Sequence, residues 1–214
     1  MTPLYSPDLD RYIRDLLPER DPVIMEMERQ ARERDIPIVG PAVASLLGVL
    51  ARSIKARRVF ELGSAIGYST AFFAQAVGPG GTVFYTDGDP ANAREARGYL
   101  GRLNLLDRVA IATGEAIGLL KNTPGDFDVV FLDIDKDGYP AALEAAAPRV
   151  RPGGFLLADN VLWSGRVVDA SARDAATEGI REFNRRLFAR SDFSSVIVPL
   201  RDGVAIARKR ETVA

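Results

Sequence analysis

Residues 131–139 read FLDIDKDGY, and residues 155–160 read FLLADN. Each stretch begins with an apolar run of the length of a buried strand and ends in acidic or amide residues. In an open α/β sheet, ligands bind just beyond the carboxyl ends of the strands. We therefore expect Asp133, Asp159 and Asn160 to meet at one edge of one sheet.

These side chains have the chemistry of a metal site. Two carboxylates and one amide oxygen are hard ligands that suit Mg²⁺, Mn²⁺ or Ca²⁺. Lys136 follows Asp133 by three residues, so one helical turn would return its amine to the same place, where it can act as a base. Either stretch alone is equally well explained by solvated turn residues after a strand. For Lys136, an exposed turn lysine is the less favoured alternative. The occurrence of both stretches in one domain favours a site.

The composition excludes several mechanisms. The 214 residues include no histidine and no cysteine, which rules out Ser-His-Asp triads, cysteine nucleophiles, His-ligated zinc and redox cysteine pairs. Acid–base chemistry must therefore rest on Asp, Glu, Lys, Tyr or a metal-bound group. A net charge of −1 argues against broad nucleic-acid binding, because phosphate contacts need an excess of basic side chains on one face.

The chain has the composition of one globular domain. With 47% hydrophobic residues it can bury a core on both faces of a sheet. We treat residues 1–214 as one domain, with residues 1–55 as an N-terminal helical segment that packs on it. No stretch approaches the roughly 18 apolar residues of a membrane span, and residues 1–15 lack the apolar core of a signal peptide. We expect a cytoplasmic protein with no membrane partner.

From residue 57 onward, strand-like and helix-like stretches alternate. Strands are expected at residues 57–63, 82–87, 108–114, 126–133 and 155–159, with a turn at 151–154. The helices between and after them are expected at residues 67–77, 90–104, 115–122, 139–150 and 177–191. Such alternation is typical of βαβ units and hence of a largely parallel sheet. Two last strands, 193–200 and 203–209, flank a short turn and should end the sheet antiparallel.

A glycine-containing turn points to a nucleoside ligand. Residues 60–70 read FELGSAIGYST and hold a strand end, Gly63, Gly67 and a helix start. The spacing is G-x-x-x-G and not the G-x-G-x-x-G of dinucleotide binders. Glu61 would repel a pyrophosphate and suits a cationic amino-acid group better. Asp87 ends the next strand, where an acid typically binds the two ribose hydroxyls.

One known family has the same motifs in the same order and spacing: ELGSAIGYS, YTDGDP, GEA, LDIDKDGY, ADNVLW and PLRDGVAIARK. From about residue 30 to its end, the chain resembles the cation-dependent O-methyltransferases of the catechol and caffeoyl-CoA type, which use S-adenosylmethionine. The resemblance implies a Rossmann-like class I methyltransferase fold of the α/β class. Its sheet would be mainly parallel and seven-stranded, with an antiparallel C-terminal strand and helices on both faces. It also implies a homodimer.

The resemblance assigns the cofactor positions residue by residue. They are Val39, Glu61, Gly63, Ser69, Asp87, Ala116 and Asp133. Glu61, Gly63 and Ser69 match positions that hold the methionine part, Asp87 matches the ribose acid, and Ala116 a residue beside the adenine. Val39 lies in a less similar stretch, at a position where the family has Thr or Met and contacts the cofactor through the backbone.

The resemblance also assigns the metal and the chemistry. Asp133, Asp159 and Asn160 match the metal ligands, with Mg²⁺ ahead of Mn²⁺ or Ca²⁺, and Lys136 matches the catalytic lysine. The acceptor would be a small phenolic molecule with two adjacent hydroxyls, of which one is methylated. Lys136, Asn160 and Trp163 would contact it, although a single Trp after a strand is equally often a core or surface residue.

Three other functions are compatible with parts of the sequence. The first is methylation of a hydroxylated base in transfer RNA by the same chemistry, for which Arg52, Lys55, Arg57 and Arg58 would supply a local basic patch. Such a patch is more simply a solvated helix end. The second is a dehydrogenase, which the glycine spacing disfavours. The third is a non-catalytic binding module, which the intact acidic motifs disfavour.

Overall fold

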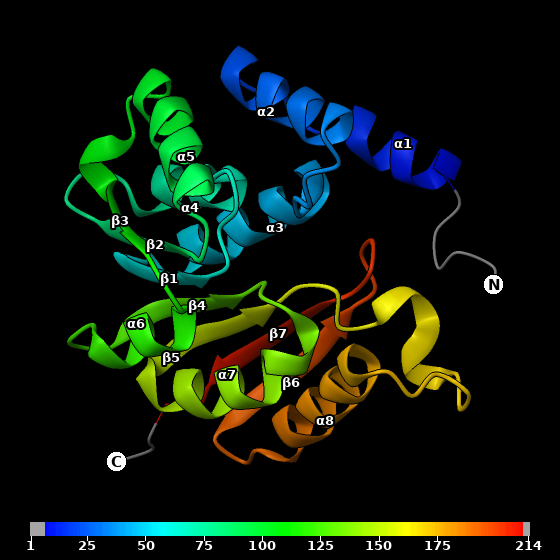
Figure 1. Ribbon diagram of the computed structural model, residues 1–214. Coiled ribbons are helices and arrows are strands. Elements are labelled where there is room, and N and C mark those ends of the chain that lie inside the picture. The colour runs from blue at the N-terminus through cyan, green and yellow to red at the C-terminus, as the bar shows by residue number, and fades with distance from the viewer. Residues whose placement is uncertain (1–6, 212–214) are drawn as a thin grey trace.

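The computed structural model describes residues 7–211 (Figure 1). The strands are β1 (Arg58–Leu62), β2 (Thr82–Asp87), β3 (Val109–Thr113), β4 (Phe127–Leu132), β5 (Val150–Ala158), β6 (Phe193–Val198) and β7 (Val204–Lys209). The α-helices are α1 (Pro7–Asp15), α2 (Pro22–Glu33), α3 (Gly40–Ser53), α4 (Tyr68–Val77), α5 (Pro90–Arg102), α6 (Ala116–Asn122), α7 (Tyr139–Ala146) and α8 (Ala175–Ala189). The 3₁₀ turns are η1 (Leu106–Arg108), η2 (Lys136–Gly138), η3 (Ala147–Arg149) and η4 (Trp163–Val168).

The seven strands form one sheet in the order β3-β2-β1-β4-β5-β7-β6. Strands β1 to β5 are parallel, and β7 runs antiparallel to both β5 and β6. The predicted fold class is therefore confirmed. The chain moves outward from β1 to β3 and then returns to β4 on the other side of β1, so the strand order reverses between β1 and β4. Ligand sites of open α/β sheets lie at such a point.

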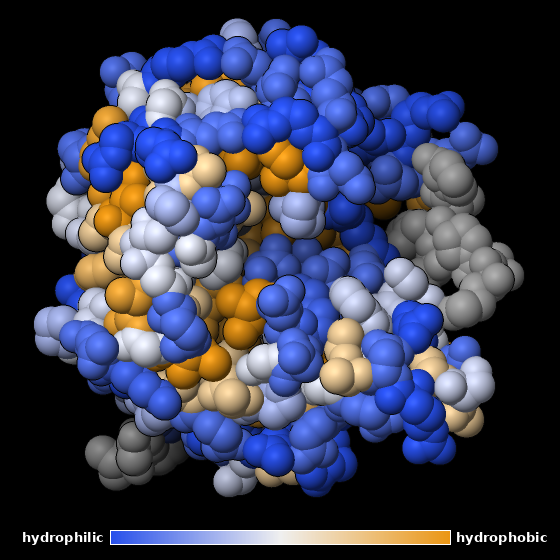
Figure 2. Space-filling model, in the orientation of Figure 1, coloured by the Kyte–Doolittle hydropathy of each residue, from blue (hydrophilic) through white to orange (hydrophobic). Residues whose placement is uncertain are grey.

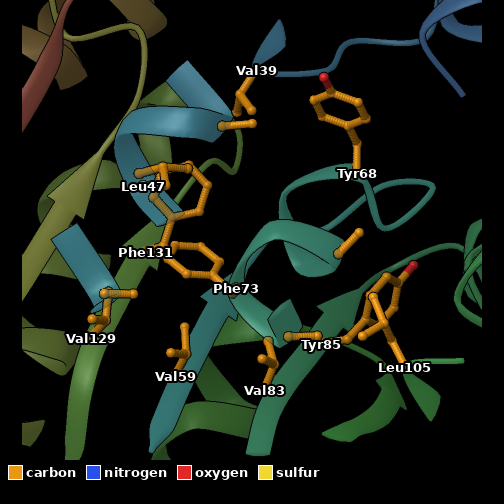
Figure 3. Packing of buried hydrophobic residues seen from close by; sticks show 14 of the residues in the cluster. Val39, Leu47, Val59, Tyr68, Phe73, Val83, Tyr85, Leu105, Val129 and Phe131 are labelled. Atoms are coloured by element: carbon orange, nitrogen blue, oxygen red, sulfur yellow. The ribbon is translucent and has the colours of Figure 1, made fainter. Parts of the chain in front are cut away.

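Helices cover both faces of the sheet (Figure 1). Helices α2 to α5 pack on one face and α6 to α8 on the other, so each face has its own core. Figure 3 shows part of the first core, where Phe73 of α4 meets Phe131 of β4 with ring centroids 5.8 Å apart. Burial on both faces explains why these strands read as continuous apolar runs.

The N-terminal helices belong to the first core. Ile24 and Met27 of α2 and Leu47 of α3 are buried in it, so α2 and α3 pack on the sheet domain. Residues 1–6 lie outside the described part. Within residues 7–211, no helix has both the length and the apolar character needed to cross a membrane.

Strand β5 begins earlier than the sequence predicts. The expected turn at residues 151–154 lies inside the strand, where the pairing with β4 shifts register between Phe127 and Val129. Gly153 has a φ of 75°, and a Cβ on Gly154 would lie 2.7 Å from the carbonyl oxygen of Asp128. The two glycines therefore form a bulge, and sheet pairing overrides the local turn signal.

Candidate active site

A cleft of about 1060 Å³ opens at the carboxyl ends of the strands beside the switch point. Figure 2 shows a hollow near the middle of one face, bordered by hydrophilic and hydrophobic residues. The predicted site residues that line the cleft are Val39, Gly63, Ser69, Asp87, Asp133, Lys136, Asp159, Asn160 and Trp163. Ala116, the first residue of α6, is not among the lining residues, and its contact with an adenine stays a prediction.

The turn after β1 requires glycine for a steric reason. Gly63 has a φ of 83°, and a Cβ there would lie 2.3 Å from the carbonyl oxygen of Asp133. The backbone N–H of Asp133 donates to the carbonyl of Leu62 at 2.8 Å. The ends of β1 and β4 therefore touch through their backbones, and any side chain at Gly63 would force the two halves of the cleft apart.

Glu61 lies beneath the cleft floor and not on it. Its side chain is fully buried, and its Oε2 accepts hydrogen bonds from the hydroxyls of Thr70 and Ser64. Oε1 has no hydrogen-bond partner among the residues described. Burial raises the pKa of Glu61 to about 7, although Thr70, Ser69 and Ser64 lower it. Because Ser64 and Ser69 line the cleft above it, Glu61 lies where a cationic group bound in the cleft would favour its ionised form.

Asp87 shapes the turn as well as lining the cleft. Its Oδ2 accepts from the backbone N–H of Ala65 at 2.9 Å. Its Oδ1 accepts from the backbone N–H of Asp89 at 2.8 Å and from the side chain of Asn92 at 3.1 Å. The sequence predicts only the ribose contact, and the structure adds this anchoring of the turn.

The two predicted metal-binding carboxylates sit at adjacent strand ends. The N–H of Asp159 donates to the carbonyl of Leu132 at 3.1 Å, so Asp159 follows β5 as Asp133 follows β4. Asp159 is only 2% exposed, and its Oδ1 has no hydrogen-bond partner within residues 7–211. Burial and the charge of Asp133 raise the pKa of Asp159. A buried carboxylate beside a second one is costly unless a cation joins them, and this need fits a divalent ion.

Asn160 supplies the third predicted ligand from a strained turn. It has a φ of 58°, and it lines the cleft next to Asp159. The residues described hold no group of three His, Cys, Asp or Glu side chains that could bind a metal. The predicted set instead has two carboxylates and one amide.

Trp163 is held by the turn between β6 and β7. Trp163 and Ser164 have φ values of 49° and 51°. The N–H of Ser164 donates to the carboxylate of Asp202 at 2.5 Å, and the N–H of Leu162 donates to the Asp202 carbonyl at 2.9 Å. Trp163 is half-buried against the second core and also lines the cleft, so it is both a packing residue and a wall of the site.

Lys136 is a buried lysine and not an exposed turn residue. Its side chain is 8% exposed, and Nζ lies 2.9 Å from Asp133 Oδ1. Helix α8 passes close to its backbone at Gly179, where a Cβ would lie 2.4 Å from the Lys136 carbonyl oxygen. The structure therefore places the Lys136 amine beside the Asp133 carboxylate, as the sequence predicts.

Sequence comparison gives the family. A family model described as O-methyltransferase matches residues 19–210. This chain belongs to the O-methyltransferase family. A curated relative, the catechol O-methyltransferase of Niastella koreensis, is 33% identical over 210 residues, which cover 93% of this chain and 95% of the relative. The family resemblance and the enzyme class predicted from the sequence are confirmed.

Solved structures agree with the fold of this O-methyltransferase. The O-methyltransferase from Bacillus cereus, in complex with SAH, aligns with a TM-score of 0.87 and 30% identity, covering 95% of this chain and 97% of that one. The O-methyltransferase TomG from Streptomyces achromogenes, in complex with SAM and involved in tomaymycin synthesis, aligns with a TM-score of 0.86 and 31% identity. It covers 95% of this chain and 96% of that one.

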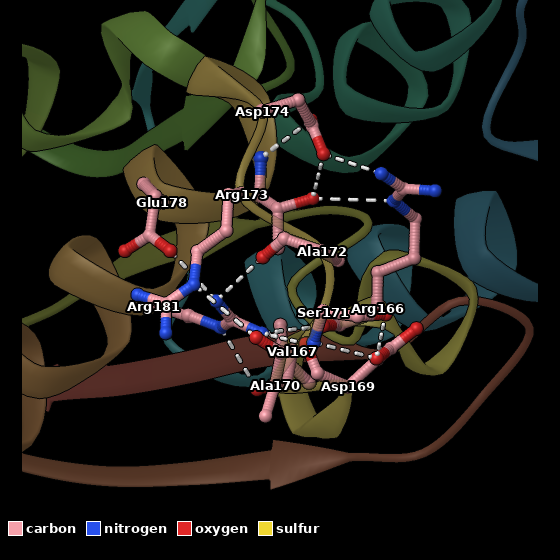
Figure 4. A network of polar contacts seen from close by, with 11 residues as sticks. Arg166, Val167, Asp169, Ala170, Ser171, Ala172, Arg173, Asp174, Glu178 and Arg181 are labelled. Carbon is pink, nitrogen blue, oxygen red and sulfur yellow. Dashed lines mark hydrogen bonds and ion pairs between the residues drawn. The ribbon is translucent and has the colours of Figure 1, made fainter.

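The segment after Trp163 in this O-methyltransferase is fastened by arginines (Figure 4). Residues 164–176 read SGRVVDASARDAA, a short polar stretch that predicts a mobile lid over the pocket. In the structure, the Arg181 guanidinium donates to the carbonyls of Val167 at 3.1 Å and Ala172 at 2.8 Å. Arg166 pairs with Asp174, which also caps α8. Any opening of this segment must break these bonds.

Sequence reasoning missed two residues that line the cleft of this O-methyltransferase. Tyr68 donates to the buried carboxylate of Glu28 at 2.7 Å, which ties α4 to α2. Arg201 donates to the carbonyl of Ile38 at 3.0 Å and to that of Val39. Tyr68 adjoins the predicted Ser69, which is a usable signal. Arg201 reaches a segment far away in the sequence, and no local pattern indicates that contact.

Proposed function

We propose that this O-methyltransferase transfers the methyl group of S-adenosylmethionine to one hydroxyl of a vicinal dihydroxy aromatic molecule, and that the reaction requires a divalent cation bound by the enzyme. The observation that carries the proposal is the buried carboxylate of Asp159 next to the partly exposed carboxylate of Asp133, with an unpartnered Oδ1 on Asp159 and the amine of Lys136 beside Asp133. The name of the Niastella koreensis relative supports the same acceptor class.

The cofactor proposal rests on the turn after β1. S-adenosylmethionine joins a nucleoside to a cationic amino acid, and the buried charge of Glu61 under Ser64 and Ser69 suits that ammonium group. The cleft of about 1060 Å³ is at the upper end of the range for small-molecule sites, so it has room for a nucleoside and an aromatic acceptor together. Two structural relatives were solved with SAH and with SAM.

The cation would be held by Asp133, Asp159 and Asn160. These oxygen donors suit Mg²⁺ first, and Mn²⁺ or Ca²⁺ as alternatives. The unpartnered Oδ1 of Asp159 and the mutual repulsion of the two carboxylates are the features that fit such an ion. When bound, the cation would stabilise the anionic form of an acceptor hydroxyl and fix its position.

The remaining chemistry falls to the side chains around the acceptor. A phenol in water has a pKa near ~10, so the attacking oxygen must lose its proton at neutral pH. Lys136 either accepts this proton or stabilises the developing negative charge. Trp163 offers a flat wall to the aromatic ring. The phenolate oxygen then forms a bond to the methyl carbon as the bond from carbon to sulfur breaks, which yields the methyl ether and S-adenosylhomocysteine.

The transfer RNA alternative finds no support in the basic patch. Arg57 donates to the carbonyls of Val77 and Pro79, and Arg58 donates to those of Asp126 and Pro124. Both guanidinium groups are therefore engaged by the protein. They also lie at the start of β1, whereas the cleft lies beyond its end, so RNA bound there would be at the wrong edge of the sheet.

The homodimer and the cytoplasmic location are part of the proposal. The sequence itself offers a second copy only the apolar stretches 23–27 and 46–50. Of these residues, Ile24 and Leu47 are buried in the core, whereas Met25 and Val49 are about half exposed. Only the exposed residues are available to a second copy. A sedimentation mass of one chain at micromolar concentration would contradict the dimer.

The acceptor class can be tested directly. Wild-type protein would be incubated with radiolabelled S-adenosylmethionine, Mg²⁺ and, separately, catechol, a caffeoyl ester, a hydroxylated nucleoside and bulk transfer RNA. We expect label on the first two acceptors. Labelling of transfer RNA alone would replace the proposed acceptor by the alternative, and labelling of none would contradict the proposed reaction.

A further inference from the structure

Tyr139 occupies a position that the proposed chemistry does not yet use. It is the first residue of α7, and its side chain is fully buried. Its hydroxyl lies 3.0 Å from the carbonyl oxygen of Leu132 and 2.9 Å from that of Asp159. Lys136 Nζ donates to the same hydroxyl at 2.9 Å. One oxygen atom therefore connects the ends of β4 and β5 with the lysine.

The direction of these bonds follows from the groups involved. A phenol has one proton to donate and two lone pairs to accept, a carbonyl can only accept, and an ammonium can only donate. The Tyr139 hydroxyl donates to one of the two carbonyls, and its oxygen accepts from an N–H of Lys136, which a neutral amine supplies as well as an ammonium does. The ring cannot turn away easily, because Phe183 packs edge-on against it with centroids 5.2 Å apart.

We propose that Tyr139 is a positioning residue for Lys136. Its hydroxyl holds the Lys136 amine at a fixed place relative to the strand ends that carry Asp133 and Asp159. This inference rests on the proposed function, because it gives Tyr139 a role through the lysine that acts on the acceptor. A lysine side chain has four rotatable bonds and loses much freedom when held, so a rigid buried partner is needed to aim it.

Asp133 alone cannot do this. Its Oδ1 also lies 2.9 Å from Lys136 Nζ, but the same carboxylate is a proposed ligand of the cation. An oxygen that binds a divalent ion has less charge left to offer an ammonium group. The Tyr139 hydroxyl is not a proposed ligand, so its bond to Lys136 persists whether or not the ion is bound.

A purely structural role for Tyr139 makes a different prediction. In that case the hydroxyl would serve only to join Leu132 and Asp159, and its loss would lower the melting temperature and slow every step alike. A positioning role instead lowers kcat through Lys136 and leaves ligand binding unchanged. The two roles separate in a double-mutant cycle.

The experiment compares wild type with Tyr139→Phe, Lys136→Ala and the double variant, using catechol and Mg²⁺. Tyr99→Phe, which removes a hydroxyl from α5 away from the cleft, is the matched control. We expect Tyr139→Phe to lower kcat by about tenfold, as for one lost hydrogen bond to a charged group. The acceptor KM and the affinity for S-adenosylhomocysteine should stay within about twofold. In the Lys136→Ala background, Tyr139→Phe should have almost no further effect.

A second readout does not need turnover. Mild reductive methylation, followed by peptide mass mapping, measures how fast each lysine reacts. We expect Lys136 to react several-fold faster in Tyr139→Phe, with exposed Lys121 as the internal standard. Unchanged Lys136 reactivity together with additive losses of kcat would overturn the inference. A wild type that methylates no acceptor would instead contradict the proposed function, and the labelling rates would still decide the role of Tyr139.

Discussion

The carboxylate of Asp87 accepts a hydrogen bond from the backbone N–H of Ala65 at 2.9 Å, which fastens the end of β2 to the turn after β1. Ala65 has a φ of 44°, a left-handed conformation that needs such support. We expect Asp87→Ala to weaken S-adenosylhomocysteine binding by about 1–3 kcal/mol and to lower the melting temperature as well. Calorimetry and thermal melts check this, and an affinity equal to wild type would contradict it.

Removing the charge of Glu61 should weaken cofactor binding and raise the stability of the fold. Replacing it by Gln removes a charge that is fully buried but keeps an oxygen for the Thr70 and Ser64 hydroxyls. We expect Glu61→Gln to bind S-adenosylhomocysteine about tenfold more weakly, because the ammonium group loses its counter-charge. At about pH 8, where the buried Glu61 of wild type is mostly ionised, the same variant should melt at a higher temperature than wild type. Glu144→Gln, at an exposed site, is the control and should do neither.

The ligand-free protein should lose stability as the pH rises. Burial raises the pKa of Glu61 to about 7 from an ordinary value of 4.5, and the pKa of Asp159 is raised too. At a pH between the ordinary and the raised pKa of such a group, the folded state binds a proton that the unfolded state has lost. The free energy of unfolding therefore falls from about pH 5 to about pH 8. Glu61 alone should account for on the order of 2–3 kcal/mol of this fall in the free energy of unfolding.

Denaturant unfolding at several pH values measures this slope, with Glu61→Gln as the comparison. The variant should show a flatter dependence of the free energy of unfolding on pH, because one of the carboxyls with a raised pKa is gone. A wild-type stability that increases over the same pH range would contradict the assignment of buried, proton-binding carboxyls at Glu61 and Asp159.

Gly179 should matter for the reaction although it lies on α8, outside the cleft lining. A Cβ there would lie 2.4 Å from the Lys136 carbonyl oxygen and 2.8 Å from the Asp137 Cα. We expect Gly179→Ala to push the η2 backbone away. Because this moves Lys136 out of place, kcat should fall about tenfold or more. Binding of S-adenosylhomocysteine should change little. Gly98→Ala, on α5 with open space around the added Cβ, is the matched control.

Much of the fold is predictable because its signals are local. The apolar runs that end at Leu62 and Leu132 are buried on both faces, and a glycine or an acid marks where each run stops. The parallel alternation then brings the residues after these strands to one sheet edge. The bulge around Gly153 was missed, because a Pro-Gly-Gly stretch is a turn signal that only the pairing with β4 overrides.

The site was predictable where chemistry coincides with strand ends. Asp133, Asp159 and Lys136 come together as expected. The burial of Glu61 under the floor was not foreseen, because sequence spacing gives the strand end but not the depth of a side chain. The contact of Arg201 with the Val39 carbonyl depends on tertiary packing and leaves no local pattern.

The most direct test of the account is the cation dependence of methyl transfer by wild type and by Asp159→Asn. Asn keeps the shape of the buried side chain but removes the charge that a cation would meet at the unpartnered Oδ1. With labelled S-adenosylmethionine and catechol, we expect wild-type turnover to stop in excess chelator and to return with Mg²⁺ or Mn²⁺. Asp159→Asn should stay folded, bind S-adenosylhomocysteine, and remain inactive at every Mg²⁺ concentration. Full wild-type activity in excess chelator, or a variant as active as wild type, would contradict the account.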